Sequence, residues 1–430
     1  MTAGVTQADK RTGSESSRVF GQAAIVGVGR VGGAALQAIS FALIARSSGP
    51  ASFGYFAAAY GVVVALQAVV GLGLIQTIVA HRAAASADQP GVKPPYEEGV
   101  VRLALRMSLL ITTVVLVLIV IAWLPIQMTQ GLKAFVPIII AWGVVDNYVE
   151  SWLGLSLADG RVYENALATV ARRAIALGFV LLATGVSGDA SLFAATGLLV
   201  GSIAVLPLVV WRNHRYVEGA LGFSWGPEVA RIGGGFWVNS VAVQLRNFDA
   251  AVLALAGAAP MVVGMYGAAS RLVTPFRIVP TSFAMVLMPH ASRVGRAGAR
   301  RLLLPVVMVV GLSSMLFASI AALSPWLIPT TLGPAYADAV PCIQIVCIGL
   351  VFASVASQFS SLLQGWGRSS LVAVIAVGSC VACLAGLVLV GTLDMGANAA
   401  AAVLCATFMI QAALLTLFVG SIFRETEQHR

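Results

Sequence analysis

Long apolar segments alternate with short polar ones along almost the whole chain. A helix that crosses a bilayer needs roughly 20 mostly apolar residues, and twelve segments reach this length. Their backbone polar groups have to be satisfied within each segment, so these runs predict helices. The pattern therefore predicts an all-α polytopic membrane protein with about twelve transmembrane helices. We place them at 19–45, 51–79, 99–125, 132–157, 164–184, 191–211, 229–257, 261–290, 302–328, 338–365, 369–391 and 395–422.

Composition excludes a soluble fold of this length. Of the 430 residues, 59% are hydrophobic and 10% charged, and the mean hydropathy is +0.93. Soluble domains contain about 25% charged residues. The first 18 residues are rich in Ser, Thr and Gly, which predicts a disordered tail at 1–18. A short polar segment at 423–430 predicts a second tail.

The distribution of Lys and Arg predicts the orientation. With the N-terminus inside, the inner segments hold 16 of the 26 Lys and Arg residues and the outer segments hold 2. Cytoplasmic loops carry such an excess, so both termini are expected in the cytoplasm. The +9 net charge follows from this bias and from arginines within helices, so it does not indicate nucleic-acid binding. A composition dominated by Ala, Val and Gly, with more Arg than Lys, favours a bacterial source.

The chain divides into two related halves. GPASFGYFAAA at 49–59 resembles APMVVGMYGAA at 259–269, with Pro50 opposite Pro260, Gly54 opposite Gly264 and Ala58 opposite Ala268. We predict an N-terminal lobe at 19–212, a cytoplasmic linker at 213–228 and a C-terminal lobe at 229–422. Six helices in each lobe make the repeats parallel, and transporters built from such repeats bind substrate between them.

Arginines within the predicted helices are the main candidates for function. Each costs about 2.5–3.5 kcal/mol at a helix centre. Those near helix ends can extend toward water and avoid most of this cost. Four are predicted to lie deepest. The full set of eight is Arg30, Arg106, Arg172, Arg173, Arg231, Arg246, Arg271 and Arg277, and the deepest are Arg30, Arg246, Arg271 and Arg277.

Three acids also lie within spans, and they leave two interpretations open. Asp146 and Glu150 share one helix face, where Glu150 could neutralise Arg172 and Arg173, and Asp249 could pair with Arg246. In the first interpretation the charges only lock helices together. In the second, the excess of arginines forms a water-filled cationic cavity for a phosphate-bearing substrate, because guanidinium groups bind phosphate oxygens in pairs.

The chain lacks the motifs of a self-contained enzyme. G-x-G-x-x-G at 27–32 lies inside an apolar helix, which excludes the dinucleotide-binding interpretation. The four histidines do not have metal-site spacing. We therefore expect a transporter without a catalytic residue, cofactor or metal. Asp146, Glu150 and Asp249 are candidates either for coupling a proton or Na⁺ or for charge compensation.

Three segments carry a resemblance to a known family. They are ISFALIARSSGPASFGYFAAAYG at 39–61, RNFDAAVLALAGAAPMVVGMYGAASRL at 246–272 and LGPAYADAVPCIQIVCIGL at 332–350, the last followed by LLQGWGR. Their order and spacing resemble the polysaccharide (O-antigen-type) flippases of the multidrug/oligosaccharidyl-lipid/polysaccharide (MOP) exporter superfamily. The resemblance covers nearly all of the chain after residue 18.

This resemblance implies two six-helix lobes around a central cavity and transport by alternating access. The substrate implied is an oligosaccharide on a polyprenyl diphosphate, moved from the inner to the outer leaflet of the bacterial cytoplasmic membrane for cell-surface polysaccharide synthesis. Arg30 and Arg271 fall on helices whose arginines serve related lipid II flippases. Expected partners are the lipid-linked anionic glycan, membrane lipids, and the polymerase or glycosyltransferases of the pathway. The alternative is an ion-coupled exporter of small amphipathic compounds, in which Asp249 and Glu150 would matter more than the arginines.

Overall fold

The computed structural model describes residues 3–70, 134–158, 161–186, 189–214, 241–294 and 300–428, together with residues 114 and 238. Within these ranges the chain is helical and has no strand. The predicted helix at 99–125 lies outside them, except for residue 114, as does the linker at 213–228 beyond residue 214. Seven helical segments of the described part are long and apolar enough to cross a membrane. The protein is therefore a multi-pass membrane protein.

The described part of the N-terminal lobe contains one long broken helix and three helices packed on it. α1 spans Ala3–Val70, and α4, α5 and α6 span Phe135–Ala158, Val162–Gly185 and Ala190–His214. α1 begins at Ala3, so residues 3–18 are helical where composition predicts a disordered tail. No proline interrupts the sequence before Pro50. The two predicted spans 19–45 and 51–79 meet at Gly49, whose φ of 72° and ψ of 168° break the helix.

The described part of the C-terminal lobe contains seven α-helices and three 3₁₀ turns. Its order is η1 (Arg246–Phe248), α8 (Asp249–Leu255), α9 (Pro260–Val273), η2 (Thr274–Arg277), α10 (Ile278–Val294), α11 (Arg300–Thr331), η3 (Pro334–Ala339), α12 (Val340–Gly365), α13 (Ser369–Thr392) and α14 (Gly396–Gln428). The predicted span 261–290 is thus divided by η2, which contains Pro275. α14 continues to Gln428, so most of the predicted tail at 423–430 extends the last helix.

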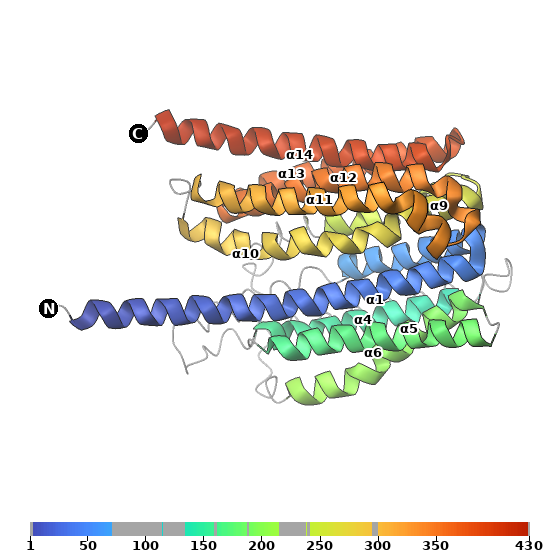
Figure 1. The fold of residues 1–430 in the computed structure, drawn as a ribbon, viewed down its shortest axis with the longest axis horizontal. Coiled ribbons are helices and arrows are strands. Elements are labelled where there is room, and N and C mark those ends of the chain that lie inside the picture. The colour runs from blue at the N-terminus through green and yellow to red at the C-terminus, as the bar shows by residue number, and fades with distance from the viewer. Residues whose placement is uncertain are drawn as a thin grey trace.

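Figure 1 shows the two lobes side by side, with α4, α5 and α6 below α1 and with α10 to α14 above it. Both labelled termini lie at the same end, as an even number of spans would require. α1 packs on α4, α5 and α6 of its own lobe and on α9, η1 and α10 of the other. The broken helix α1 therefore belongs to the N-terminal core and also forms the seam between the lobes.

The seam is tightest at the end near the α1 break, where the two halves of the sequence repeat meet. A side-chain carbon added to Gly54 would lie 2.8 Å from the Gly264 nitrogen and 2.9 Å from the Pro260 oxygen. One added to Gly264 would overlap the Pro50 oxygen. The contact is reciprocal, because each glycine meets the backbone at or near the proline of the other repeat. Equivalent residues of the repeat therefore face one another across the seam.

Polar contacts reinforce this end. Arg46 Nη1 donates to the Thr330 carbonyl at 3.0 Å and to the Thr331 carbonyl at 3.4 Å, at the last turn of α11. The Tyr336 hydroxyl donates to the Ala45 carbonyl at 3.2 Å. A cation at a helix C-terminus meets carbonyls that lack helical partners. The lobes are thus held together at the end opposite the chain termini.

Candidate functional site

The four arginines predicted to contact a diphosphate do not form one cluster. Arg246 and Arg277 approach one aromatic ring in the C-terminal lobe, whereas Arg271 is engaged with an aspartate. Arg30 is half-buried on α1, on the N-terminal side of the seam. The structure therefore separates the predicted set into a pair, an ion-paired residue and a residue on the other lobe.

We call Arg246 and Arg277, with Phe408 between them, the C-lobe arginine pair. The Arg246 guanidinium carbon lies 4.8 Å from the Phe408 ring centroid, and that of Arg277 lies 5.2 Å from it. Arg246 Nη2 also donates to Gln411 Oε1 at 2.7 Å, while its buried Nε has no hydrogen-bond partner. Neither arginine forms an ion pair with an acid of the described residues. Two positive charges therefore lie close together, and their contacts among the described residues are a ring and an amide.

Local backbone geometry brings these two residues together. Arg246 begins the 3₁₀ turn η1, directly before α8, and Arg277 ends the turn η2, directly before α10. Pro275 lacks an N–H and so favours an interruption of the helix at η2. Phe408 and Gln411 are three apart on α14, so they lie on the same side of that helix.

Asp249 pairs with Arg271, and the predicted pairing with Arg246 is wrong. Arg271 Nη2 lies 2.7 Å from Asp249 Oδ1, and both side chains are buried. The Tyr266 hydroxyl donates to Asp249 Oδ2 at 3.0 Å, and the Ala250 N–H donates to Oδ1 at 2.7 Å. Asp249 starts α8 after the 3₁₀ turn, and its carboxylate is directed toward α9. Arg246 therefore does not form an ion pair with Asp249.

The Asp249–Arg271 pair lies at the seam. Arg271 also donates to Asn247, through Nη1 to Oδ1 at 3.1 Å and through Nη2 to the carbonyl at 2.7 Å. A side-chain carbon at Gly61 of α1 would overlap both the Asn247 carbonyl and the Arg271 guanidinium. The backbone of the opposite lobe therefore covers this cluster directly.

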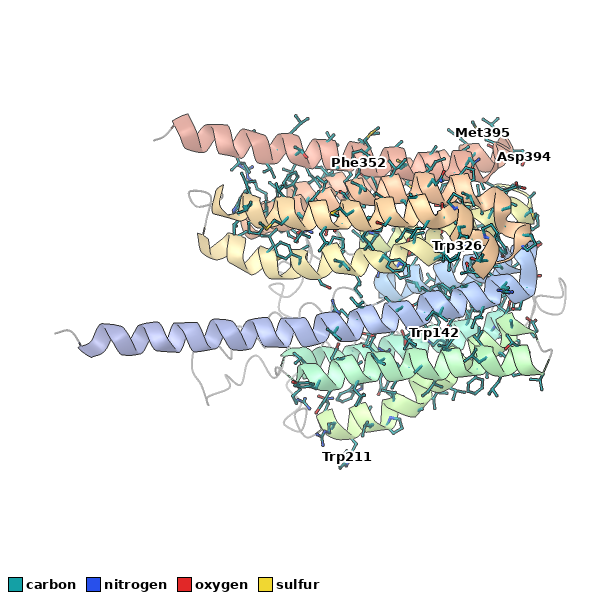
Figure 2. The ribbon with its side chains drawn as sticks, viewed as in Figure 1. Trp142, Trp211, Trp326, Phe352, Asp394 and Met395 are labelled. Atoms are coloured by element: carbon teal, nitrogen blue, oxygen red, sulfur yellow. The ribbon has the colours of Figure 1, made fainter. Side chains whose placement is uncertain are left out.

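In the N-terminal lobe, Arg172 forms ion pairs with both acids of α4. Arg172 Nη1 lies 2.7 Å from Asp146 Oδ1, and Nη2 contacts Glu150 Oε1. Ser202 Oγ of α6 donates to the same Asp146 oxygen at 2.9 Å. The prediction that Arg172 is neutralised is confirmed. Arg173 forms no ion pair with either acid, and its guanidinium carbon lies 5.8 Å from the centroid of the Trp142 ring, which Figure 2 labels.

Arg106 and Arg231 lie outside the described residues. Sequence reasoning did not identify Phe408 or Gln411 as part of the site. A glutamine within the apolar run 396–422 is a signal that could have been used, because polar groups in spans are costly and tend to have partners. Nothing in the sequence distinguishes Phe408 from the other aromatic residues of the spans.

A metal site is not indicated by the described part of the chain. It contains no group of three His, Cys, Asp or Glu side chains placed to hold an ion. The five cysteines are unpaired, and four of them are buried.

Comparison with solved structures shows which known fold the chain has. An inward-facing multidrug resistance MATE family transporter of the MOP superfamily matches with a TM-score of 0.71 and 15% identity, over 92% of this chain and 96% of that one. The chain has the MATE transporter fold. An outward-facing structure of a protein with the same description gives a TM-score of 0.65 and 14% identity, over 94% of this chain and 96% of that one. The predicted fold class, an all-helical membrane protein with the two-lobed MOP architecture, is thereby confirmed.

A third neighbour shares the same fold. It is a MOP superfamily transporter from Pyrococcus furiosus, described as having a binding pocket of reverse polarity that suggests a different function. It matches with a TM-score of 0.68 and 14% identity, over 94% of this chain and 96% of that one. Neither the models of protein families nor the curated proteins gave a match. At these identities the neighbours establish the fold, which is that of MATE transporters, while the O-antigen-type flippase subfamily remains a prediction.

Proposed function

We propose that the protein is a membrane transporter that moves an amphipathic molecule with an anionic head by alternating access. The observation that carries this proposal is the C-lobe arginine pair, two arginines around Phe408 without an acidic partner among the described residues. Burying an unneutralised cation in a membrane protein is costly, and such residues tend to mark a substrate or ion pathway. A guanidinium pair is well suited to phosphate oxygens, which accept paired hydrogen bonds.

The substrate class that fits best is a lipid-linked oligosaccharide with a diphosphate. A diphosphate diester carries two negative charges, and Arg246 and Arg277 carry two positive ones. Arg271 adds no net charge, because Asp249 neutralises it. The protein would then act as a flippase from the inner to the outer leaflet, with Arg246 and Arg277 binding the diphosphate and the polyprenyl chain remaining in lipid. Arg30, on the other lobe, is a further candidate contact.

A second function is favoured by the structural neighbours. Two of them are described as multidrug resistance transporters, which supports an ion-coupled exporter of small amphipathic compounds. In that case Asp146, Glu150 and Asp249 are the candidates for coupling a proton or Na⁺. Each of these acids is ion-paired with an arginine, so uptake of a proton or Na⁺ would have to compete with Arg172 or Arg271.

The conformation supports alternating access for either substrate. The lobes touch tightly at the end opposite the termini, and the inward-facing neighbour gives a higher TM-score than the outward-facing one. If the termini are cytoplasmic, as predicted, the contact end is the outer one. Substrate would enter from the inside, and separation of the seam would release it outside.

The test is transport in proteoliposomes with two substrates. One assay follows a fluorescent polyprenyl-diphosphate sugar between leaflets, and the other follows export of a small amphipathic dye. For the flippase we expect Arg246→Gln with Arg277→Gln to lower the flipping rate at least about tenfold, as each charge-assisted bond contributes about 1.5–3 kcal/mol. Arg212→Gln, which removes an exposed arginine at the end of α6, is the control and is expected to flip normally.

The outcomes separate the two functions. Flipping that survives the double substitution would exclude the arginine pair as the head-group site. Dye export without flipping, abolished by Asp249→Asn or Glu150→Gln but not by the arginine substitutions, would establish the exporter. Transport of neither substrate would overturn both proposals.

A further inference from the structure

Two buried arginines of the C-terminal lobe have partners of different chemistry. Arg271 Nη2 donates to Asp249 Oδ1 at 2.7 Å. Arg246 Nη2 donates to Gln411 Oε1 at the same distance. All four side chains are buried. A carboxylate cancels the charge of its arginine, whereas a neutral amide only accepts a hydrogen bond. Arg246 is therefore held by a partner that leaves its charge intact.

Three helices next to the C-lobe arginine pair contribute no acid to it. α10 begins directly after Arg277, α13 packs on the turn η1, and α14 carries Phe408 and Gln411. The sequence has no Asp or Glu in α10 or α13, nor in α14 before Glu425. Asp249, at the start of α8, is already paired. The polar partner of Arg246 in the described part of the chain is thus the Gln411 amide.

Gln411 is placed to orient the Arg246 guanidinium. Gln411 and Phe408 are both buried on the same side of α14, so packing fixes the acceptor and the ring together. Gln411 accepts one of the five N–H groups of Arg246, and the buried Nε of Arg246 has no hydrogen-bond partner in the described part of the chain. The guanidinium is therefore held at one corner while donors remain available for an anion.

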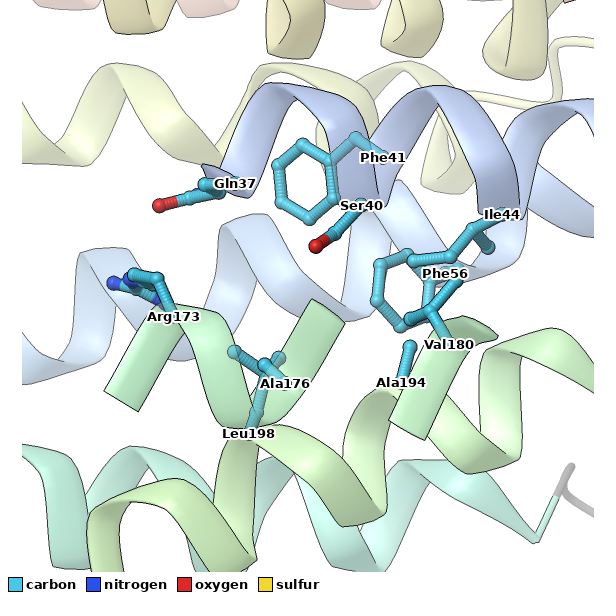
Figure 3. Close-up of a pocket in the computed structure, with 10 residues that line it drawn as sticks. All are labelled: Gln37, Ser40, Phe41, Ile44, Phe56, Arg173, Ala176, Val180, Ala194 and Leu198. Carbon is cyan, nitrogen blue, oxygen red and sulfur yellow. The ribbon is translucent and has the colours of Figure 1, made fainter. Parts of the chain in front are cut away.

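Arg173 of the N-terminal lobe does not provide a comparable site. Figure 3 shows the small space beside it, between α1, α5 and α6, with Ile44 and Val180 among its lining side chains. The lining surface is almost wholly apolar, and the space has room for about one water molecule. A phosphate group is too large for it, so Arg173 adds no charge to a head-group site there.

We propose that Gln411 is a positioning residue that orients Arg246 and, because it is an amide, keeps the C-lobe arginine pair at two positive charges. The site then selects a head with two negative charges over a head with one. A carboxylate at position 411 would neutralise Arg246 as Asp249 neutralises Arg271. This inference rests on the proposed function and deepens it, since it assigns the charge selectivity of the same site to one side chain.

The test measures binding of two probes to the full-length protein in nanodiscs by calorimetry. Farnesyl methyl diphosphate is a diester with two negative charges, and farnesyl methyl phosphate has the same chain and one negative charge. We expect the wild-type protein to bind the dianion at least about tenfold more tightly than the monoanion, because one charge-assisted hydrogen bond is enough to change a dissociation constant about tenfold.

Two substitutions of Gln411 separate its charge from its packing. Gln411→Glu is nearly isosteric and neutralises Arg246, so it is expected to lower the affinity for the dianion at least about tenfold and to remove the preference. Gln411→Met retains the length of the side chain and both arginine charges. It is expected to weaken both probes about fivefold, through loss of the orienting hydrogen bond, and to keep the preference. A residue that served only for packing would give equal losses for both probes in both variants.

Gln344→Glu is the matched control. It also converts a glutamine of the C-terminal lobe to an acid, but the Gln344 amide donates to the Ala321 carbonyl rather than bonding an arginine. Both probes are expected to bind this variant as they bind the wild type. Arg246→Gln with Arg277→Gln, measured with the same probes, is expected to lose the preference for the dianion.

The outcomes distinguish this inference from the proposed function. A wild-type protein without a preference, or a preference that survives in the double arginine variant, would overturn the head-group site and the inference with it. A preference that depends on the arginines but persists in Gln411→Glu would overturn only the role of Gln411. The same conclusion would follow if Gln411→Met bound both probes like the wild type or lost the preference.

Discussion

Two adjacent arginines on α5 contact different partners. Successive residues of an α-helix point about 100° apart. Arg172 is therefore directed to Asp146 and Glu150 of α4, while Arg173 is directed to Trp142. A buried ion pair contributes little net stability, but removal of one partner is costly. At this scale, the partner of a charged side chain decides whether it serves the fold or can serve a ligand.

The Asp249–Arg271 pair allows a prediction about stability. Asp249→Ala leaves Arg271 buried without its carboxylate, which is expected to cost about 3–5 kcal/mol. Arg271→Ala should cost a similar amount, because it leaves the aspartate unpaired. The double variant should be less destabilised than the sum of the two. The measurement is denaturant unfolding in detergent, and additive losses would contradict direct coupling of the two residues.

At the scale of elements, the breaks in the helices determine the arrangement of the chain more than the helix lengths do. The break at Gly49 turns α1 back on itself, and the turn η2 directs Arg277 to Phe408. The glycine contact between α1 and α9 lets two backbones approach closely, as small residues do in membrane helix pairs. The repeat thus forms the seam from two equivalent segments.

This close approach predicts that the seam does not tolerate side chains. Gly264→Leu is expected to separate α1 from α9, since even one added carbon would overlap the Pro50 oxygen. The protein should still insert in the membrane, but the lobes should no longer close at this end. The distance between spin labels on α1 and α9 is the measurement. Gly378→Leu is the control, because an added carbon there meets nothing within 4 Å. An unchanged distance in Gly264→Leu would refute the predicted contact.

At the scale of the whole molecule, two lobes meet along α1 and α9, and polar contacts lie at one end of that seam. Arg46 bonds the last carbonyls of α11, and Tyr336 bonds the Ala45 carbonyl. These contacts join residues almost 300 positions apart. Both must break when the lobes separate at this end, so they bias the equilibrium toward the closed arrangement.

Loss of these contacts is expected to open the seam. Arg46→Gln with Tyr336→Phe should raise the reactivity of a cysteine introduced at Ala57, which is buried against Gly267. The measurement is labelling by a membrane-impermeant maleimide, applied from each side. Ser47→Ala is the control, because the Ser47 hydroxyl bonds only carbonyls of its own helix. Equal labelling in wild type and variant would show that the two contacts do not control closure.

The same assay tests the predicted orientation. The charge bias places both termini in the cytoplasm, so cysteines added at the two ends should react only from the inside. The labelled Ala57→Cys variant should react from the outside once the seam opens. Labelling of the termini from the outside would reverse the proposed direction of transport.

The order and type of the helices could be predicted from the sequence because they depend on local properties. Runs of about 20 apolar residues determined where most described spans lie, and glycines and prolines determined where they break. The repeat at 49–59 and 259–269 pointed to two related halves. The predicted disordered tail differs from the helix that begins at Ala3, because composition does not report where a helix without proline will end.

The partners of the charges were decided only by the tertiary structure. Sequence spacing suggested Arg246 with Asp249, but the aspartate meets Arg271 from the next helix. It also suggested one role for Arg172 and Arg173, whereas only Arg172 reaches the acids. Phe408 and Gln411 lie more than 130 residues from Arg246 and Arg277, and only packing brings them together. The position of a spanning helix depends on the hydrophobicity of consecutive residues, so it can be predicted from the sequence. The partner of a buried charge depends instead on which helices pack side by side.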